Sequence, residues 1–240
     1  VGKPARGFKS LLLRSRFDMK VSDLFYFIGN CVIYTEYEMR NDIVKEEEKL
    51  RDPDMREILF ETYENTGERL RIFEELVIGK SRADVILVKE NEILGFEIKS
   101  DKDNLIRLTT QVKNYERFCD KCYIVTGVHY IDKIEEAVPK HWGVYDIAKD
   151  ENGNLHIEMF REANRNPKER PTTKLKNQMN LLWRSELIKI VKTYKLGGVT
   201  KRNKRQLRDL IIEKMGKEEA KRMTYDALIE RDYSIYQKED

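Results

Sequence analysis

Three side chains that can do chemistry accompany the two apolar runs of the stretch SRADVILVKENEILGFEIKSD, which extends from Ser81 to Asp101. Asp84 comes directly before the run VILV, and Glu97 and Lys99 stand one residue apart near the end of the stretch. Two carboxylates within a few ångströms repel each other unless a cation neutralises them, and hard oxygen ligands suit Mg²⁺ or Mn²⁺. Such a metal can polarise a phosphoryl oxygen and lower the pKa of bound water. Lys99 would then hold the attacking water or offset charge that develops on the phosphate.

The same stretch predicts two apolar strands joined by a short polar turn. Because side chains alternate along a strand, Glu97 and Lys99 point to one face, whereas Phe96 and Ile98 point into the core. Antiparallel pairing of the two strands can bring Asp84 beside Glu97. The competing interpretation is a solvated salt-bridge patch on a strand face, and the three residues alone do not decide between the two.

Neighbouring segments predict helices and further strands around this hairpin. A helix starts with Asp52 as its N-cap and Pro53 at its first position, and it ends at Gly67. After the hairpin, DNLIRLTTQVKNYERF has apolar residues at helical spacing and is capped by Asp103. The segments that follow predict a buried strand in CYIVTGV, a short helix in YIDKIEEAV, and a hairpin of WGVYDI with LHIEMF around the Asn-Gly turn at Asn152.

Composition divides the chain into three parts. Residues 8–50 have a helical pattern, REANRNPKERPTT is a polar linker that contains proline, and the segments from LLWRSEL onward are again helical. We therefore expect an N-terminal helical segment over residues 1–52, a core domain over 53–162, and a basic linker with a helical extension over 163–240.

The motif residues resemble a known enzyme superfamily. The segments ADVILV and GFEIKSD, with Asp84, Glu97 and Lys99, resemble the core of the PD-(D/E)xK nucleases, although Ala83 stands where a proline is usual. Gln111 and Tyr115 are similar to the Gln-x-x-x-Tyr motif of nuclease modules related to the recombination helicase-nucleases, and one helical turn separates them. The resemblance covers roughly residues 55–215 and is nearest to poorly characterised bacterial and phage members.

This resemblance implies both a fold and an activity. The fold is α/β, a restriction-endonuclease-like αβββαβ core in which helices flank a mixed central sheet. The activity is phosphodiester hydrolysis with Mg²⁺ or Mn²⁺ bound at Asp84, Glu97 and Ile98, assisted by Gln111 and Tyr115. An upstream helical glutamate often completes such sites. The candidates here are unranked: Glu57, Glu61, Glu64, Glu74 and Glu75.

A CxxC motif offers a second possible metal site. Some relatives with the Gln-x-x-x-Tyr motif bind an iron–sulfur cluster through four cysteines, but Cys119 and Cys122 have only Cys31 as a third partner in this sequence. A zinc site that also uses His129 is conceivable. We favour the simpler interpretation of one cysteine at a helix end followed by one in a buried strand.

Charge is distributed unevenly along the chain. Residues 163–240 contain 20 basic and 11 acidic residues, and between Arg165 and Arg208 there are 14 bases and two acids. Such a block is typical of a surface that binds a polyanion. The tail loosely resembles SAP-type helix–extension–helix DNA-binding modules, and a helical brace on the core is the alternative. The residues expected to contact phosphates are Lys201, Arg202, Lys204, Arg205 and Arg208.

Together these features favour a metal-dependent nuclease that acts on DNA. One alternative is a catalytically inactive, nuclease-like module that binds nucleic acid, and another is a structural or protein-binding protein. The sequence lacks a run of about 18 apolar residues, so we expect no membrane span, and its three cysteines fit a reducing cytoplasm. A homodimer is compatible with each of these interpretations.

Overall fold

The computed structural model describes residues 50–100, 103–127, 131–150 and 152–233. Backbone contacts divide the chain into two units, Val1–Lys49 and Leu50–Asp240, and the description below concerns the second. The helical segment expected over residues 8–50, together with Cys31 and His129, lies outside the described residues apart from Leu50. The predicted boundaries at residues 52 and 162 stay predictions.

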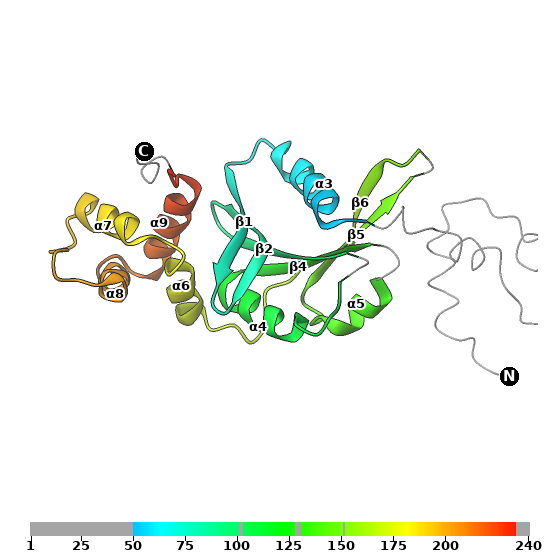
Figure 1. The fold of residues 1–240 in the computed structure, drawn as a ribbon. Coiled ribbons are helices and arrows are strands. Elements are labelled where there is room, and N and C mark those ends of the chain that lie inside the picture. The colour runs from blue at the N-terminus through cyan, green and yellow to red at the C-terminus, as the bar shows by residue number, and fades with distance from the viewer. Residues whose placement is uncertain (1–49, 101–102, 128–130, 151, 234–240) are drawn as a thin grey trace, which may run out of the picture. The chain divides into compact units, whose positions relative to one another are not determined.

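A six-stranded mixed sheet forms the centre of this unit (Figure 1). The strands follow one another in space in chain order. β1, β2 and β3 are antiparallel, β3, β4 and β5 are parallel, and β6 is antiparallel to β5. This arrangement confirms the predicted α/β class with a mixed sheet. The strands are β1 (Leu70–Ile78), β2 (Ser81–Lys89), β3 (Ile93–Lys99), β4 (Lys121–Gly127), β5 (Gly143–Lys149) and β6 (Leu155–Arg161).

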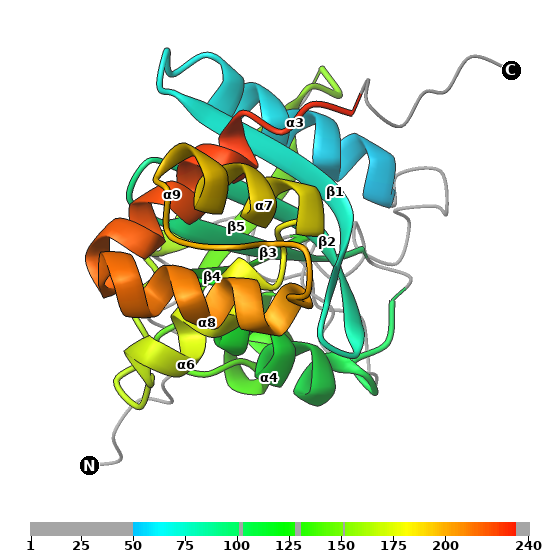
Figure 2. The same cartoon turned by 90° about the vertical axis from the view of Figure 1, so that its left-hand side faces the viewer.

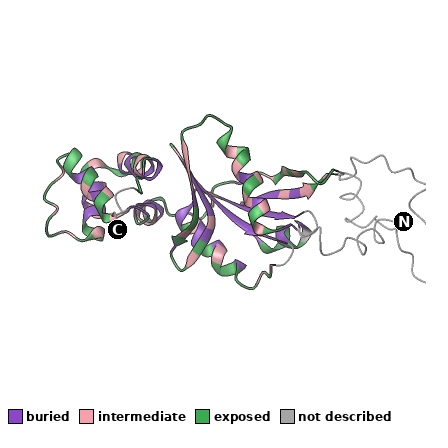
Figure 3. Cartoon of the chain, turned by 45° about the horizontal axis from the view of Figure 1, so that its top comes forward, coloured by how far each residue is buried: buried purple, intermediate pink, exposed green. Residues whose placement is uncertain are grey.

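Helices cover both faces of the sheet, which accounts for the near-continuous apolar character of its central strands. On one face, α3 (Asp52–Glu64) buries Met55 and Leu59 against β2 and β3. On the other lie α4 (Leu108–Phe118) and α5 (Ile131–Ala137) (Figure 1). Figure 3 shows that the strands between these layers are largely buried. The order α3, β1, β2, β3, α4, β4 is the expected αβββαβ.

Four further helices follow the sheet, and Figure 2 shows them grouped in front of it. They are α6 (Pro171–Met179), α7 (Arg184–Thr193), α8 (Lys204–Met215) and α9 (Lys217–Ile229). Their apolar residues share one core with α4 and β2, and α6 contacts α4 while α9 contacts β1 and β2. Helices α7, α8 and α9 were expected from the sequence, whereas the residues of α6 were assigned to the linker and its neighbourhood.

Two predicted helix starts are wrong, for a shared reason. Arg51 occupies the N-cap of α3, and Asp52 lies inside the helix, where its carboxylate pairs with Arg56. Helix α4 begins at Leu108, because the Asp103 carboxylate accepts hydrogen bonds at 2.8 Å from both the backbone N–H and the hydroxyl of Ser100. In each case a capping-type acid binds another donor, so its sequence position does not mark the helix start.

The end of α3 lies within one residue of the expected segment DMREILFETYEN. The helix stops at Glu64, with Asn65 as its C-cap, and Gly67 follows with a φ of +68°. Gly67 therefore supplies the left-handed turn that leads into β1.

Candidate active site

The candidate site forms where β2 and β3 separate. The last antiparallel pair joins Val85 of β2 to Phe96 of β3, and Asp84 and Glu97 lie directly beyond this pair in the sheet. Beyond this point β3 continues beside β4, with Lys99 opposite Thr126. Separation of two paired strands exposes backbone groups that need other partners, and it leaves room for side chains between the strands.

Tyr115 of α4 fills this gap. Its hydroxyl donates to the Phe96 carbonyl at 2.9 Å and accepts from the Asp84 backbone N–H at 2.9 Å, so it bridges the two strands. Burial raises the pKa of Tyr115 well above its usual value, which keeps the proton that the hydroxyl donates. Gly95 permits this approach, because a Cβ there would lie 2.6 Å from the Tyr115 ring. Tyr115 therefore positions Asp84.

Asp84 is mostly buried, and four neighbours hold or influence its carboxylate. Oδ2 accepts a hydrogen bond from the Ile98 backbone N–H at 2.8 Å, and Oδ1 lies 3.8 Å from the guanidinium of Arg56. Burial and the charge of Glu97 raise the pKa of Asp84 to about 7, although Ile98, Lys99 and Arg56 oppose the shift. The charge of Glu97 thus acts on Asp84 in the direction expected for two carboxylates that approach each other.

Glu97 is fully buried and only half satisfied. Its Oε1 accepts hydrogen bonds from the ammonium of Lys99 and the side-chain amide of Gln111. Its Oε2 has no hydrogen-bond partner among the described residues, and neither has Oε1 of Gln111. Burial raises the pKa of Glu97, and Lys99 partly offsets this. Two buried oxygen acceptors without donors are costly in a folded protein unless a ligand satisfies them.

The alternation along β3 is as predicted. Phe96 and Ile98 belong to the core under α3, whereas Glu97, Lys99 and Gly95 face α4. Only the backbone of Ile98 therefore lies within reach of the acidic residues. Gln111 lies one turn before Tyr115 on α4 and reaches the same face of the sheet.

The donor set suits a hard cation but is small. Asp84, Glu97 and Gln111 offer only oxygen atoms with open acceptor capacity, which is the chemistry that Mg²⁺ and Mn²⁺ prefer. Among the residues that the structure describes, however, no three His, Cys, Asp or Glu side chains form a group that could hold a metal. A metal here would rely on two carboxylates, supplemented by amide or backbone oxygen and by water.

The upstream glutamates do not join this pair. Glu74 and Glu75 of β1 lie 3.6 Å and 2.8 Å from the guanidinium of Arg56, which also lies 3.8 Å from the Asp84 carboxylate. The remaining candidates are exposed on α3 or at its end: Glu57, Glu61 and Glu64.

Arg56 is a site residue that sequence reasoning missed. It contacts four carboxylates, and its guanidinium also donates to the Asp84 backbone carbonyl at 2.9 Å, while its side chain is only 13% exposed. The only local signal is Asp52, four residues earlier on the same helix face. The other contacts arise from β1 and β2, so they depend on the tertiary fold. The carboxylates belong to Asp52, Glu74, Glu75 and Asp84.

The five basic residues predicted to contact phosphates fall into two groups. Lys204 donates to the Asn180 carbonyl at 2.7 Å, Arg208 is buried and donates to the Asn180 side chain at 3.0 Å, and Arg202 donates to the Gly198 carbonyl. In contrast, Lys201 is exposed. The side chain of Arg205 is 82% exposed and lies 3.8 Å from Asp209. The structure therefore presents two of the five to solvent and ties three into the helical tail.

The CxxC cysteines are both free and buried. Cys119 is the C-cap of α4 and Cys122 lies in β4, which is the arrangement favoured from the sequence. Burial and a contact with Cys119 raise the pKa of the Cys122 thiol well above its usual value, which disfavours the thiolate that a metal would need.

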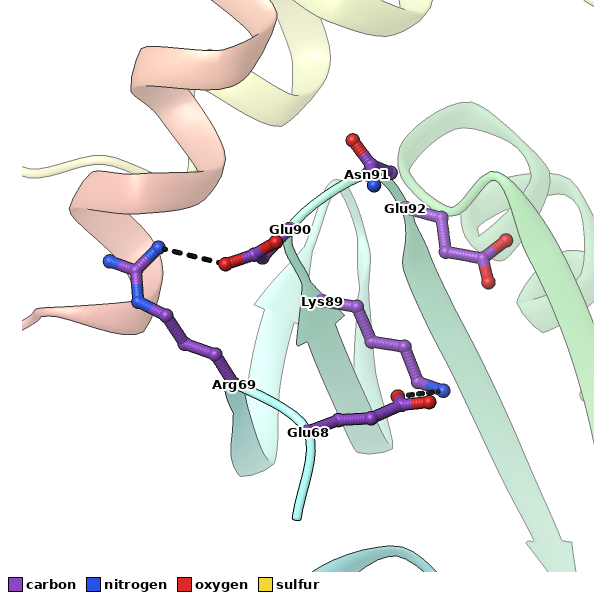
Figure 4. Close-up of a pocket in the computed structure, with 6 residues that line it drawn as sticks. All are labelled: Glu68, Arg69, Lys89, Glu90, Asn91 and Glu92. Atoms are coloured by element: carbon purple, nitrogen blue, oxygen red, sulfur yellow. Dashed lines mark ion pairs between the residues drawn. The ribbon is translucent and has the colours of Figure 1, made fainter. Parts of the chain in front are cut away.

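An open pocket of about 390 Å³ lies at the other end of the β2–β3 hairpin (Figure 4). Its charged side chains satisfy each other: Lys89 lies 2.6 Å from Glu68, and Arg69 lies 3.6 Å from Glu90. The hairpin turn lines this pocket, and the paired strand residues 85–88 and 93–96 separate it from Asp84 and Glu97. Its lining residues are Glu68, Arg69, Lys89, Glu90, Asn91 and Glu92.

The fold and this site define an α/β protein with a mixed sheet and a buried acidic pair at the point where two central strands part. Residues 45–239 match the family described as Bacteriophage P4 protein cII, and the chain belongs to that family. The phage connection expected from the sequence agrees with this description. No curated relative matches the chain.

One solved structure is similar, the SfsA protein of Pyrococcus furiosus in complex with Ca²⁺. It is 16% identical, and the match covers 45% of this chain and 59% of the SfsA chain, with a TM-score of 0.27. A TM-score this low supports no argument about fold or function. Each helix in the described part of the chain is too short or too polar to cross a membrane.

Proposed function

We propose that this protein is a metal-dependent nuclease that hydrolyses phosphodiester bonds in DNA with Mg²⁺ or Mn²⁺. The observation that carries the proposal is a pair of buried acceptors close to Asp84. Glu97 Oε2 and Gln111 Oε1 have no hydrogen-bond partner among the described residues. A divalent cation would bind Glu97 Oε2 and relieve the repulsion between the two carboxylates, and water bound to that cation would donate to Gln111 Oε1.

Membership in the PD-(D/E)xK superfamily, with its Gln-x-x-x-Tyr motif, is part of this proposal. It is supported by the αβββαβ order of elements and by the approach of the four motif positions at one point of the sheet. Four residues from three elements reach this point. They are Asp84 of β2, Glu97 and Lys99 of β3, and Gln111 of α4.

The chain's own residues have distinct parts in the proposed reaction. Asp84 and Glu97 are the cation ligands, and the bound cation would polarise the phosphoryl oxygen and lower the pKa of the attacking water. Lys99, held by Glu97, orients that water or offsets the charge that develops on the phosphate. Gln111 donates to Glu97 and can turn its amide toward the phosphate, and Tyr115 positions Asp84 without contact with substrate.

The nucleic-acid partner is proposed from the exposed basic residues of the tail. Lys201 and Arg205 lie just before and at the start of α8, and both are exposed. Lys192 and Lys195, at the end of α7 and just beyond it, are exposed as well. Phosphate contacts of this kind supply affinity without sequence selectivity. This surface also fits the second candidate function, a nuclease-like module that binds nucleic acid without cutting it.

Cleavage assays separate the two functions. The protein should be incubated with labelled linear, circular and single-stranded substrates in Mg²⁺, in Mn²⁺ or in EDTA. We expect cleavage that requires the metal and is absent in the Glu97→Gln variant. Binding without cleavage in every metal would favour the inactive module, and a failure to bind DNA would exclude both.

A further inference from the structure

The environment of Arg56 contains more negative charge than one guanidinium can neutralise. Four carboxylates lie within 4 Å of it, with Asp52 on its own helix, Glu74 and Glu75 on β1, and Asp84 on β2. The side chain is 13% exposed, so water screens these charges weakly. Among the contacts that the structure describes, the Arg56 guanidinium is the cation nearest to Oδ1 of Asp84.

Three contacts fix the guanidinium in this position. Asp52 and Glu75 bind it from different elements, the second at 2.8 Å, and it donates to the Asp84 carbonyl at 2.9 Å. Glu75 itself has a φ of +52°, a left-handed backbone conformation that is unfavourable for a residue with a side chain. Glu75 lies opposite Asp84, between the strand pairs Glu74–Val85 and Leu76–Ala83, and the β1–β2 pairing is interrupted at this position.

We infer that Arg56 is the resident counter-ion of Asp84, and that a divalent cation bound by Asp84 and Glu97 takes over this role in competition with it. Only the second half of this inference, the competition with a bound cation, rests on the proposed function. Arg56 is a positioning residue in this account, since it acts on the Asp84 side chain and its backbone. Its guanidinium holds the carboxylate until the metal arrives, and its positive charge then opposes metal binding.

The first half is tested in EDTA, without metal or substrate. Thermal melts of wild type, Arg56→Gln, Asp84→Asn and the double variant form a double-mutant cycle that isolates the coupling of the two side chains. We expect Arg56→Gln to lower the melting temperature by roughly 5 °C in the wild-type background and by clearly less when Asp84 is already an amide. Equal losses in both backgrounds would overturn the counter-ion role.

The second half is tested by Mn²⁺ titration in a calorimeter. Removal of a positive charge beside the ligand should tighten Mn²⁺ binding by about tenfold in Arg56→Gln, whereas Arg56→Lys should stay near wild type. Arg82→Gln is the matched control: Arg82 also binds Glu75, at 2.9 Å, but is 69% exposed and has no contact with Asp84 among the described interactions. It should change neither result.

The outcomes distinguish this inference from the proposed function. Coupling in the cycle with no Mn²⁺ binding by any variant would retain Arg56 as the counter-ion of Asp84 and would overturn both the competition and the proposed metal site. Mn²⁺ binding that is unchanged or weaker in Arg56→Gln would overturn the competition alone, because the wild type would still bind metal.

Discussion

Two buried carboxylates in this molecule have opposite surroundings. Asp120, between α4 and β4, has donors on both oxygens: Oδ2 accepts from the Ile93 N–H, Gln178 and Tyr225, and Oδ1 faces Arg165. Glu97, about as deeply buried, leaves Oε2 without a partner among the described residues. The fold itself completes the first acid, whereas the second retains a capacity that only a ligand can use.

The difference separates stability from function. The donors of Asp120 come from β3, the linker, α6 and α9, so this one side chain ties the helical tail to the sheet. Those of Glu97 come from its own strand and from α4. We therefore expect changes at Asp120 to unfold the protein, and changes at Glu97 to affect its chemistry.

The largest expected effect is loss of cleavage in Glu97→Gln and Asp84→Asn. Both substitutions preserve side-chain volume and remove the charge of a proposed metal ligand, so each should lower the cleavage rate at least about a thousandfold, which corresponds to roughly 4 kcal/mol. The rate is measured in Mg²⁺ and Mn²⁺ with labelled DNA. Retained cleavage by either variant would refute the assignment of that residue.

The second effect concerns stability, measured by urea denaturation. Asp120→Asn replaces an acceptor by a donor opposite several buried donors, and we expect a loss of about 3–5 kcal/mol. Glu97→Gln, an equivalent change of a buried acid, should cost clearly less in EDTA, because the loss of its ion pair with Lys99 is offset in part by removal of a desolvated charge whose second oxygen has no donor. If both variants lost similar stability, the contrast between the two acids would not hold.

The third effect is a pH dependence of the metal-free protein. The folded pKa of Asp84, about 7, lies above its ordinary value of 3.8, so the native state retains a proton that the unfolded chain loses. This contribution is complete below pH 4 and is lost as pH rises to 7, with a maximum of about 4 kcal/mol.

The Asp84→Asn variant lacks this titration, so it is the reference against which the wild type is compared. In EDTA, the melting temperature of wild type minus that of the variant should become more negative between pH 5 and pH 8. Glu97, whose pKa is raised as well, remains in both proteins, but its titration changes when the charge of Asp84 is removed, so the difference reports the coupled pair of carboxylates. A difference that stays constant with pH would show that Asp84 titrates normally.

Local patterns sufficed to predict the elements that carry the site. The period-two pattern placed Glu97 and Lys99 on one face of β3, and helical spacing placed Gln111 and Tyr115 on one helix face, whereas the resemblance to the Gln-x-x-x-Tyr motif implied that Gln111 joins the site. Their type and spacing also predicted a cation, which stays a prediction.

The missed features depend on contacts distant in sequence. Asp120 meets Gln178 and Tyr225 across 58 and 105 positions, and Arg56 meets Asp84 across 28. Helix α6 was missed because only Leu175 and Met179 provide an apolar face, and its stability depends on docking against α4.

The fourth prediction concerns Gln111 and Tyr115, which lie on one helix face but have different partners. Gln111→Ala removes a donor to Glu97 and an open acceptor, so we expect a ten- to hundredfold lower cleavage rate, or about 1–3 kcal/mol, with little change in melting temperature. Tyr115→Phe removes the hydroxyl that bridges Asp84 and Phe96. It should lower the melting temperature and reduce the rate less. The reverse pattern would assign the chemistry to Tyr115.

The smallest effect applies the same distinction between satisfied and open groups to the basic tail. Lys201 and Arg205 are exposed, whereas Lys204 is anchored on the Asn180 carbonyl. Joint replacement of Lys201 and Arg205 by Ala should weaken DNA binding uniformly across sequences and reduce the slope of log affinity against log salt by about 2. Lys204→Ala should instead lower the melting temperature, because it removes a hydrogen bond within the tail, and it should change the slope less. Filter binding at a series of salt concentrations measures both. If the double variant kept the wild-type slope, the exposed bases would not contact phosphate, and the tail would be a brace whose charges are solvated.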